Sequence, residues 1–325
     1  IYTSADIGVQ TAAYIAKKMN LYYHTEELAI CATNKLHMRN KAKEFGLGIP
    51  KYLSAENLEE AKLKAKDIGY PVIIKPLDNC SSRGVVVVNN DDEMELQFQE
   101  TKSHSGFNFI LIEELLVGIE GSIEAIIVES KATILGISDR EKSELPYRYD
   151  TQINYPGNYT EKQLEQIKQF IDDLVTGYEI KQGIIHTEII VNDDVYLVEF
   201  GLRSGGSKII THLLANTLDF DIVEHQIYNS FNIKKAINIK KKYHGILKFI
   251  LLPDGKIKSI KGVDKVLKTE GVIDFDIERK AGDLISTVKD GRSRPGYLLV
   301  QGKSRKECEE LIEKITSLYK VEYEN

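Results

Sequence analysis

The sequence "GIIHTEIIVNDDVYLVEFGLRSGG", residues 183–206, carries the strongest indication of how this chain folds. Two runs rich in β-branched and aromatic residues flank Asp193 and Asp194. This pattern predicts a β-hairpin with the two aspartates as its turn. Such a turn pairs Asn192 with Val195 and fixes the register of the whole ribbon.

That register places Glu188 opposite Glu199 on one face, with Cβ atoms about 5 Å apart. At about 4 Å and an effective dielectric near 20, two carboxylates repel by roughly 4 kcal/mol. Folding retains the pair if one carboxyl stays protonated or a cation lies between them. Oxygen ligands favour magnesium, manganese or calcium over zinc. Two alternatives stay open: a register slip that turns one glutamate to solvent, and a glycosidase-like acid pair.

A second stretch, "PVIIKPLDNCSSRGVVVV" (residues 71–88), has an apolar strand that ends in Lys75, a loop of small and polar residues, and another apolar strand. Gly84 gives the loop freedom to fold over a ligand. Such a loop can close over phosphates, with the lysine as a point charge beneath them. The sequence has neither a GxxxxGK[ST] loop nor a GxGxxG fingerprint here. An ordinary hairpin with an extended lysine is the alternative.

Downstream, "FILIEELLVGIEGSIEAII" (residues 109–127) reads as an extended segment with carboxylates at Glu113 and Glu120. Free backbone groups of such a segment can read an adenine edge, and a nearby carboxylate can hold ribose hydroxyls. The alternative is a plain edge hairpin with solvated glutamates.

Composition sets outer limits. The chain has 325 residues, 42% hydrophobic and 28% charged, which allows two or three domains. A net charge of −6 gives no electrostatic argument for nucleic acid or an anionic membrane. Cys31, Cys80 and Cys308 form no CxxC pair, so we expect no disulfide framework or zinc site and a cytoplasmic location. No stretch reaches membrane-spanning length.

Other patterns predict the surrounding elements. Helices are expected over about 5–19, 35–45 and 207–230, and a capping box of Thr160 and Gln163 opens a further helix. "ELPYRYDTQINYPGNY" (residues 144–159) has little periodicity and reads as a functional loop. From His244 onward the pattern indicates a small α+β unit that begins with a hairpin around Pro253–Gly255.

In this order, "NKLHMRNKAKEFGLGIPKY", "YPVIIKP", "SSRGVVVV", "IEELLVGIEGSIE", "GIIHTEIIV" and "VEFGLRSGG" resemble ATP-grasp enzymes, and most of all the carboxylate–amine ligase branch that includes L-amino-acid ligases. The resemblance implies an α+β fold in which two subdomains grip ATP. It implies a remnant of an N-terminal α/β domain at 1–30, the first part with a small lid at 31–108, the second part with the metal site at 109–240, and a small C-terminal α+β domain at 241–325. Because the chain starts at Ile1, we expect most of the N-terminal domain to be missing.

The resemblance also implies roles for single residues. It assigns phosphate contacts to two lysines, a mobile loop to the serine-rich segment, adenine recognition to Glu113 and the Leu115 backbone, and the ribose to Glu120. The phosphate-binding lysines would be Lys35 and Lys75, and the mobile loop would consist of Ser81, Ser82, Arg83 and Gly84. Magnesium (or manganese) would be held by Glu188 and Glu199. Arg203 would contact the acyl phosphate, and Gly205 and Gly206 would receive the substrate carboxylate. His186 and Arg148 are weaker substrate candidates, and a structural histidine and a solvent-facing arginine are the alternatives.

The implied function is an ATP-dependent ligase that joins a carboxylate, an amino acid, to an amine through an acylphosphate and releases ADP and phosphate. Its partners would be these two small molecules, and the family suggests a homodimer. One departure concerns Gly201, where many relatives carry a metal-binding Asn. Two rivals stay open: a biotin-carboxylase-like enzyme that phosphorylates bicarbonate, and a non-catalytic nucleotide-binding subunit.

Overall fold

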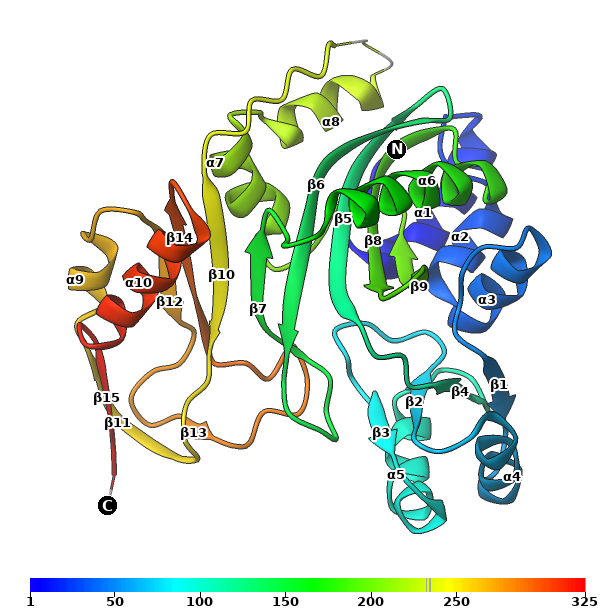
Figure 1. Ribbon diagram of the computed structural model, residues 1–325, viewed down its shortest axis with the longest axis horizontal. Coiled ribbons are helices and arrows are strands. Elements are labelled where there is room, and N and C mark those ends of the chain that lie inside the picture. Colours follow the sequence, from blue (N-terminus) through cyan, green and yellow to red (C-terminus); the bar gives the residue numbers. More distant parts are fainter. Residues whose placement is uncertain (232, 234, 325) are drawn as a thin grey trace.

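The computed structural model describes residues 1–231, 233 and 235–324, so Asn325 of the expected C-terminal domain lies outside it. Figure 1 shows the arrangement of its elements. In chain order these are α1 (Asp6–Met19), α2 (Glu26–Thr33), α3 (Lys35–Glu44), β1 (Tyr52–Ala55), α4 (Leu58–Ile68), β2 (Val72–Pro76), β3 (Val86–Val88), α5 (Asp91–Ser103), β4 (Ile110–Glu114), β5 (Ile119–Val128), β6 (Lys131–Lys142), β7 (Asp150–Tyr155), α6 (Glu161–Gly177), β8 (Gln182–Val191), β9 (Val195–Gly201), the π-helical η1 (Ile209–Leu214), α7 (Ala215–Leu218), α8 (Ile222–Ser230), β10 (His244–Ile250), β11 (Gly255–Lys261), α9 (Val263–Leu267), β12 (Val272–Ile277), β13 (Leu284–Ile285), β14 (Gly296–Gly302), α10 (Arg305–Thr316) and β15 (Lys320–Tyr323).

The largest sheet has eight strands in the order β12-β14-β10-β7-β6-β5-β8-β9. Side chains alternate between its faces, so Ile127 of β5 packs with α1–α3 and α6, while Ile126 packs with η1, α7 and α8. Helices therefore cover both faces of its central strands. Because β10 pairs with β7, the sheet continues across the domain boundary expected at residue 240, and that boundary stays a proposal.

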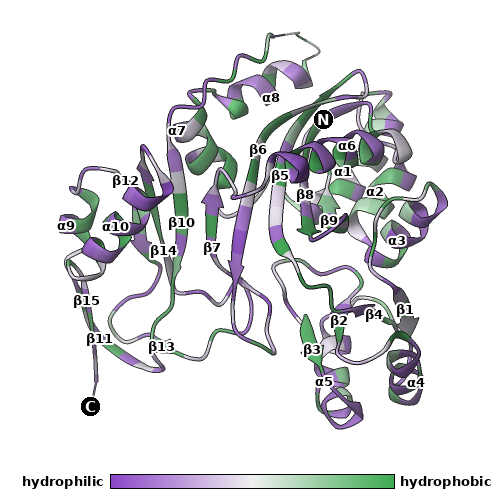
Figure 2. Cartoon of the chain, viewed as in Figure 1, coloured by the Kyte–Doolittle hydropathy of each residue, from purple (hydrophilic) through white to green (hydrophobic). Residues whose placement is uncertain are grey.

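A four-stranded sheet, β1-β4-β2-β3, forms a smaller layer with α4 and α5. Its core includes Ile74 of β2 and Phe98 of α5, which are almost fully buried. Figure 1 shows this layer below the end of the large sheet, and in Figure 2 its strand β3 is coloured as hydrophobic. The loop after Lys75 is thereby held between the two sheets.

The C-terminal part adds a three-stranded sheet, β13-β11-β15, and helices α9 and α10. The hairpin expected around Pro253–Gly255 does not form. Strand β10 pairs with β7 and β14, whereas β11 pairs with β13 and β15. Both edges of β10 are therefore occupied by other strands, and the turn connects two different sheets.

Several local predictions are confirmed. Helices α1 and α3 lie where they were expected, and Thr160 and Gln163 form the capping box of α6. In the segment 207–230, η1 runs directly into α7, and Asp219, which adopts a left-handed conformation with φ of 49°, ends α7 before α8 begins. The expected loop 144–159 contains strand β7, and α2 was not predicted. No helix within the described ranges is long and apolar enough to cross a membrane.

The hairpin of β8 and β9 has the expected carboxylate pairing but a different turn. Val191, not Asn192, pairs with Val195, so the loop has three residues. A β-bulge between the pairs Ile189–Leu197 and Glu188–Glu199 then shifts the register by one residue. The bulge lies at residue 198 and turns Glu199 to the face of Glu188. Without it, Glu199 would share the face of Leu197, which is fully buried under the helices.

We predict that the core under α6 contributes a large part of the stability. Leu174 is fully buried there, and Leu174→Ala should lower the free energy of unfolding by about 2–5 kcal/mol, because it leaves a cavity. Leu164→Ala on the same helix is the control, since Leu164 is 39% exposed and should lose less than about 0.5 kcal/mol. Chemical denaturation of both variants measures the difference, and equal losses would contradict this packing.

Candidate active site

A cavity of about 770 Å³ lies between the two larger sheets and brings together side chains from distant segments. All the residues proposed from the sequence line this cavity except Gly84 and Gly205. Those that line it are Lys35, Lys75, Ser81, Ser82, Arg83, Glu113, Leu115, Glu120, Arg148, His186, Glu188, Glu199, Arg203 and Gly206. The site residues thus come from both sheets and from α3.

Protein cations compensate the charges of the glutamate pair, a solution that the sequence argument did not include. Arg140 Nη1 donates to Glu188 Oε1 at 2.5 Å, and Lys35 Nζ lies 2.8 Å from Glu199 Oε2. Although burial raises the pKa of Glu188, Arg140 outweighs it and holds the pKa well below its usual range. Protonation of Glu188 is therefore not how the pair is tolerated. Burial alone would lower the pKa of Lys35, but Glu199 outweighs it and raises the pKa.

Arg39 connects the glutamate pair to the second lysine. Its side chain is fully buried; Nη2 donates to the Val198 carbonyl at the bulge (2.7 Å), and Nε donates to Glu113 Oε1 (2.6 Å). Lys75 Nζ donates to the other oxygen of Glu113 at 2.6 Å. One buried arginine therefore fixes both the bulge that aligns Glu199 and the carboxylate that holds Lys75.

This geometry differs from the expected role of Glu113. Both of its carboxylate oxygens are bonded to cations and the residue is 1% exposed, so its side chain positions Lys75 and is not directed at an adenine amino group. Burial raises the pKa of Glu113, but Arg39 and Lys75 outweigh it and lower the pKa to about 2. Burial lowers the pKa of Lys75 in spite of Glu113. Leu115 lines the cavity just after β4.

The loop between β2 and β3 folds in the left-handed region. Ser81 and Ser82 have φ values of 61° and 57°, which cost side chains other than glycine of the order of 1 kcal/mol each. Ser82 Oγ donates to the Arg148 carbonyl at 3.0 Å. Gly84 has φ of 69° and lies outside the cavity, and a Cβ there would come within 2.9 Å of His104 and Pro76. Its role is conformational.

The expected ribose acid, Glu120, lies in a cluster of charges at the cavity wall. Arg148 forms an ion pair with Glu120, and Lys142 Nζ lies 3.2 Å from Glu120 and 2.8 Å from Asp150. Arg148 is therefore bound to a carboxylate at the cavity wall and is not simply a solvent-facing arginine. Glu120 is available to a ribose only in part, since two cations already contact it.

Arg203 is held by a residue that the sequence did not indicate. Its Nε and Nη2 donate to the two carboxylate oxygens of Asp6 at 2.9 and 2.8 Å, and Nη1 donates to the Ser204 carbonyl. A Cβ on Gly201 would lie 3.1 Å from Asp6 Oδ1 and 3.4 Å from Arg203 Nε. Glycine at 201 thus leaves room for this bidentate pair.

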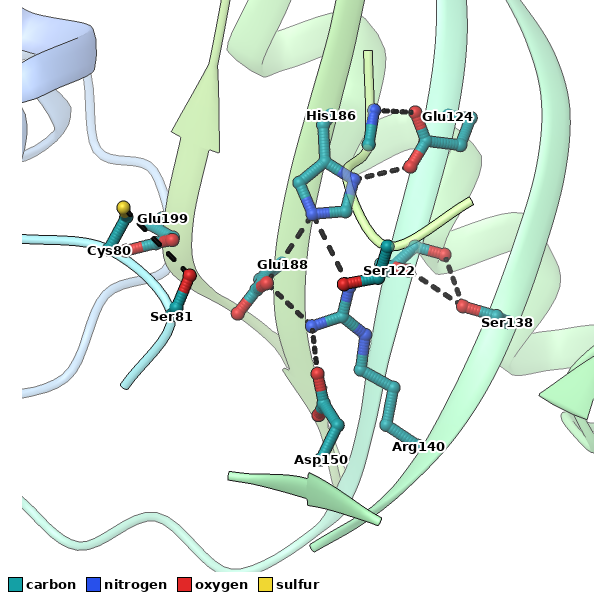
Figure 3. A network of polar contacts seen from close by, with 12 residues as sticks. Cys80, Ser81, Ser122, Glu124, Ser138, Arg140, Asp150, His186, Glu188 and Glu199 are labelled. Atoms are coloured by element: carbon teal, nitrogen blue, oxygen red, sulfur yellow. Dashed lines mark hydrogen bonds and ion pairs between the residues drawn. The ribbon is translucent and has the colours of Figure 1, made fainter. Parts of the chain in front are cut away.

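His186 lies on the same face as Glu188 in a buried network (Figure 3). Its Nδ1 contacts Glu124 Oε1, and its Nε2 lies 3.3 Å from Arg140 Nη2. Burial would lower the pKa of His186, but Glu124 outweighs it and raises the pKa to about 9. Gly205 N donates to Glu124 Oε2 at 2.9 Å, so this N–H is not free for a substrate carboxylate as expected. Gly206 does line the cavity.

Sequence reasoning missed Asp6, Arg39, Arg140 and two cavity arginines, Arg292 and Arg294. The sequence did contain one signal for the bulge. Apolar residues alternate at Val195 and Leu197, but the next one on this face pattern is Phe200, three residues after Leu197 and not two, as expected for a bulge. Arg39 and Arg140 had no comparable signal, because each acts through a residue distant in sequence.

Family comparisons fit this geometry. Residues 68–212 match the model of the ATP-grasp domain, and residues 248–324 match L-amino acid ligase C-terminal domain 2. Residues 68–212 of this chain therefore form an ATP-grasp domain. A curated relative of this ATP-grasp chain, the carbamoyl phosphate synthase large chain of Campylobacter jejuni, is 30% identical over 173 residues, which are 51% of this chain. The chain spans only 16% of that relative's length.

Solved structures show the same ATP-grasp fold. An L-amino acid ligase from Bacillus licheniformis has a TM-score of 0.85 at 20% identity, and the match covers 100% of this chain and 80% of the other. A biotin carboxylase from Campylobacter jejuni has a TM-score of 0.71 at 18% identity, with 96% and 72% covered. These likenesses concern the fold, including its C-terminal part.

The glutamate pair fits a nucleotide-bound magnesium ion. Glu188 Oε2 and Glu199 Oε1 have no partner among the described residues, so each glutamate keeps one oxygen for a ligand. No group of three or more His, Cys, Asp or Glu side chains in the described ranges could hold a metal ion. Magnesium commonly takes one or two carboxylates and fills its other positions with phosphate oxygens and water.

We predict a stability loss at low pH that comes from Glu113. Its carboxyl has a pKa of about 2 in the folded protein against 4.5 ordinarily, so its contribution is present above pH 4.5 and is lost as the pH falls toward 2. The loss should approach about 3 kcal/mol. Unfolding measured against pH should be less steep over this range for Glu113→Gln than for the wild type. Equal slopes for the two proteins would refute the assignment.

We predict that Arg39 is required to hold the Glu113 carboxylate and the Val198 carbonyl in place. Arg39→Met leaves Glu113 and the Val198 carbonyl without this donor and should cost about 3–5 kcal/mol of stability. Lys41→Met on the same helix removes an exposed pair with Glu44 and should cost under about 1 kcal/mol. Thermal unfolding tests both, and a small effect of Arg39→Met would show that the buried pair is dispensable.

Proposed function

We propose that this chain is an ATP-dependent ligase that joins a carboxylate, an amino acid, to an amine through an acylphosphate, with release of ADP and phosphate. The observation that carries the proposal is the convergence of the Glu188–Glu199 pair, two buried lysines and Arg203 on one cavity. The match to the ATP-grasp domain model supports nucleotide binding. The match to the L-amino acid ligase domain supports C–N bond formation.

In this proposal Glu188 and Glu199 hold magnesium, or manganese, through their unpartnered oxygens, and the ion would neutralise charge on the phosphates. Lys35 and Lys75 supply fixed positive charges for the same phosphates. Both lysines are buried and hydrogen-bonded, so little reorganisation is needed when the phosphoryl group is transferred.

Arg203 would stabilise the negative charge of the acylphosphate and of the tetrahedral intermediate that forms when the amine attacks. Asp6 holds its guanidinium bidentately and leaves one N–H on each terminal nitrogen. Preorganised donors of this kind are worth about 10²–10³-fold in rate. The Ser81–Ser82 loop would cover the intermediate and exclude water, which would otherwise hydrolyse it.

Two rivals are separated by the same assay. A biotin-carboxylase-like enzyme shares the fold and would release ADP with bicarbonate and biotin, without an amino acid. A non-catalytic subunit would bind ATP and release no ADP with any substrate pair. The L-amino acid ligase domain match favours the ligase over both. A cytoplasmic location and a homodimer stay predictions.

The decisive prediction concerns Glu199→Gln. Substrate-dependent ADP release should fall by at least about 10²-fold, because the variant loses a charge that the metal and the transferring phosphoryl group require. Asp194→Asn at the turn of the same hairpin is the control and should keep wild-type turnover. A phosphate-release screen of amino-acid pairs on the wild type identifies the substrates first. Full activity of the Glu199 variant would end the metal assignment.

A further inference from the structure

The charge balance of the cavity leaves some arginines without a counter-ion. Most cavity cations have a carboxylate partner, such as Lys35 with Glu199, Arg140 with Glu188 and Arg203 with Asp6. Arg83, Arg292 and Arg294 line the cavity, and none of them forms an ion pair with a carboxylate of the described residues. Arg292 is exposed, whereas Arg83 and Arg294 are partly buried. A partly buried cation without a counter-ion is costly unless an anion binds to it.

Arg294 is the most strongly fixed of the three. Its Nε donates to the Gly291 carbonyl at 2.7 Å, and its Nη1 donates to the Asp150 carbonyl at 3.0 Å. The guanidinium carbon lies 3.3 Å from the centre of the Phe249 ring. Burial lowers the pKa of Arg294 to about 10, so the side chain stays charged at neutral pH. Its position is therefore set before any ligand binds.

The loop that carries Arg294 comes from the C-terminal part and is packed against the serine-rich loop between β2 and β3. Gly291 N donates to the Ser81 carbonyl at 2.9 Å, and a Cβ at Gly291 would lie 3.2 Å from that oxygen. Arg292 Nη2 lies 3.7 Å from Cys80 Sγ. Gly291, Arg292 and Arg294 of the loop 289–295 thus form part of the cavity wall.

Arg294 is anchored on different strands from the proposed metal ligands. It contacts Phe249 of β10 and Asp150 of β7, whereas Glu188 and Glu199 lie on β8 and β9, beyond β6 and β5 in the sheet. Its Nη2 lies 3.5 Å from Ser207 Oγ, beside the 203–206 turn. Lys35 and Lys75, which are assigned to the phosphates, come from α3 and β2, so Arg294 is held by different elements of the fold.

We propose that Arg294, assisted by Arg292, binds the unreactive carboxylate of the amine substrate and thereby selects amines that carry one. This inference rests on the proposed ligase function. The remaining N–H groups of the guanidinium can form a bidentate contact with one carboxylate. The C-terminal domain would then determine the choice of acceptor.

The test compares acceptor amino acids with their carboxamides, using ADP release with the acid substrate found in the wild-type screen. Wild type should prefer the free acid by about 10- to 100-fold in kcat/KM, the usual worth of a charge-assisted contact. Arg294→Gln should remove most of this preference by raising the KM for the acid, with the KM for ATP unchanged. Arg279→Gln is the control, because Arg279 contacts the same loop through Ser293 but does not line the cavity.

Other outcomes are equally clear. An Arg294→Gln enzyme that keeps the preference, or that instead raises the KM for ATP, overturns the inference and leaves the ligase function standing. Arg294→Lys keeps the charge without the planar fork, so it should retain part of the preference if Arg294→Gln does not fold. A wild type that releases no ADP with any pair of amino acids or amides removes the proposed function, and the inference falls with it.

Discussion

The site depends on holding two like charges side by side. Glu188 and Glu199 face each other across β8 and β9, and the fold tolerates them because Arg140 and Lys35 each neutralise one oxygen of one glutamate. Only one oxygen of each carboxylate is used in this way. The pair is therefore stable in the protein alone and still has ligand capacity for a cation, a combination that simple repulsion between two carboxylates would forbid.

The rest of the cavity extends this principle of charges fixed in advance. Arg39 holds the bulge carbonyl and Glu113, Glu113 holds Lys75, and Asp6 holds Arg203. Arg39, Lys75 and Arg203 thus each have a carboxylate partner that fixes their geometry before a ligand arrives. Such preorganisation is worth most where water is excluded, because the same charges interact more strongly at low dielectric. The arginines of the 289–295 loop are the exception, since they await an external anion.

Domain organisation explains why residues so distant in sequence can meet. Strand β10 adds to the edge of β7, so the C-terminal part shares one sheet with the glutamate ribbon. The loop before β14 then reaches back to the serine-rich loop between β2 and β3 through Gly291 and Ser81. The four-stranded sheet brings Lys75 and Glu113 to the opposite wall. Three separate segments therefore complete one cavity, and none of them forms a site alone.

The sequence by itself determined the local features: α1, α3 and the capped α6, the serine-rich loop after Lys75, and a ribbon that pairs Glu188 with Glu199. The helices follow from periodicity and capping over a few residues, whereas the glutamate pairing was predicted from a two-residue turn that the structure replaces with a three-residue loop and a bulge. Only the tertiary structure decided that the pairing requires a bulge, that Glu113 faces cations, and that Asp6, Arg39, Arg140 and Arg294 belong to the site. The physical reason is that an ion pair forms wherever opposite charges meet in space, and a buried charge shows no periodicity that would identify its distant partner.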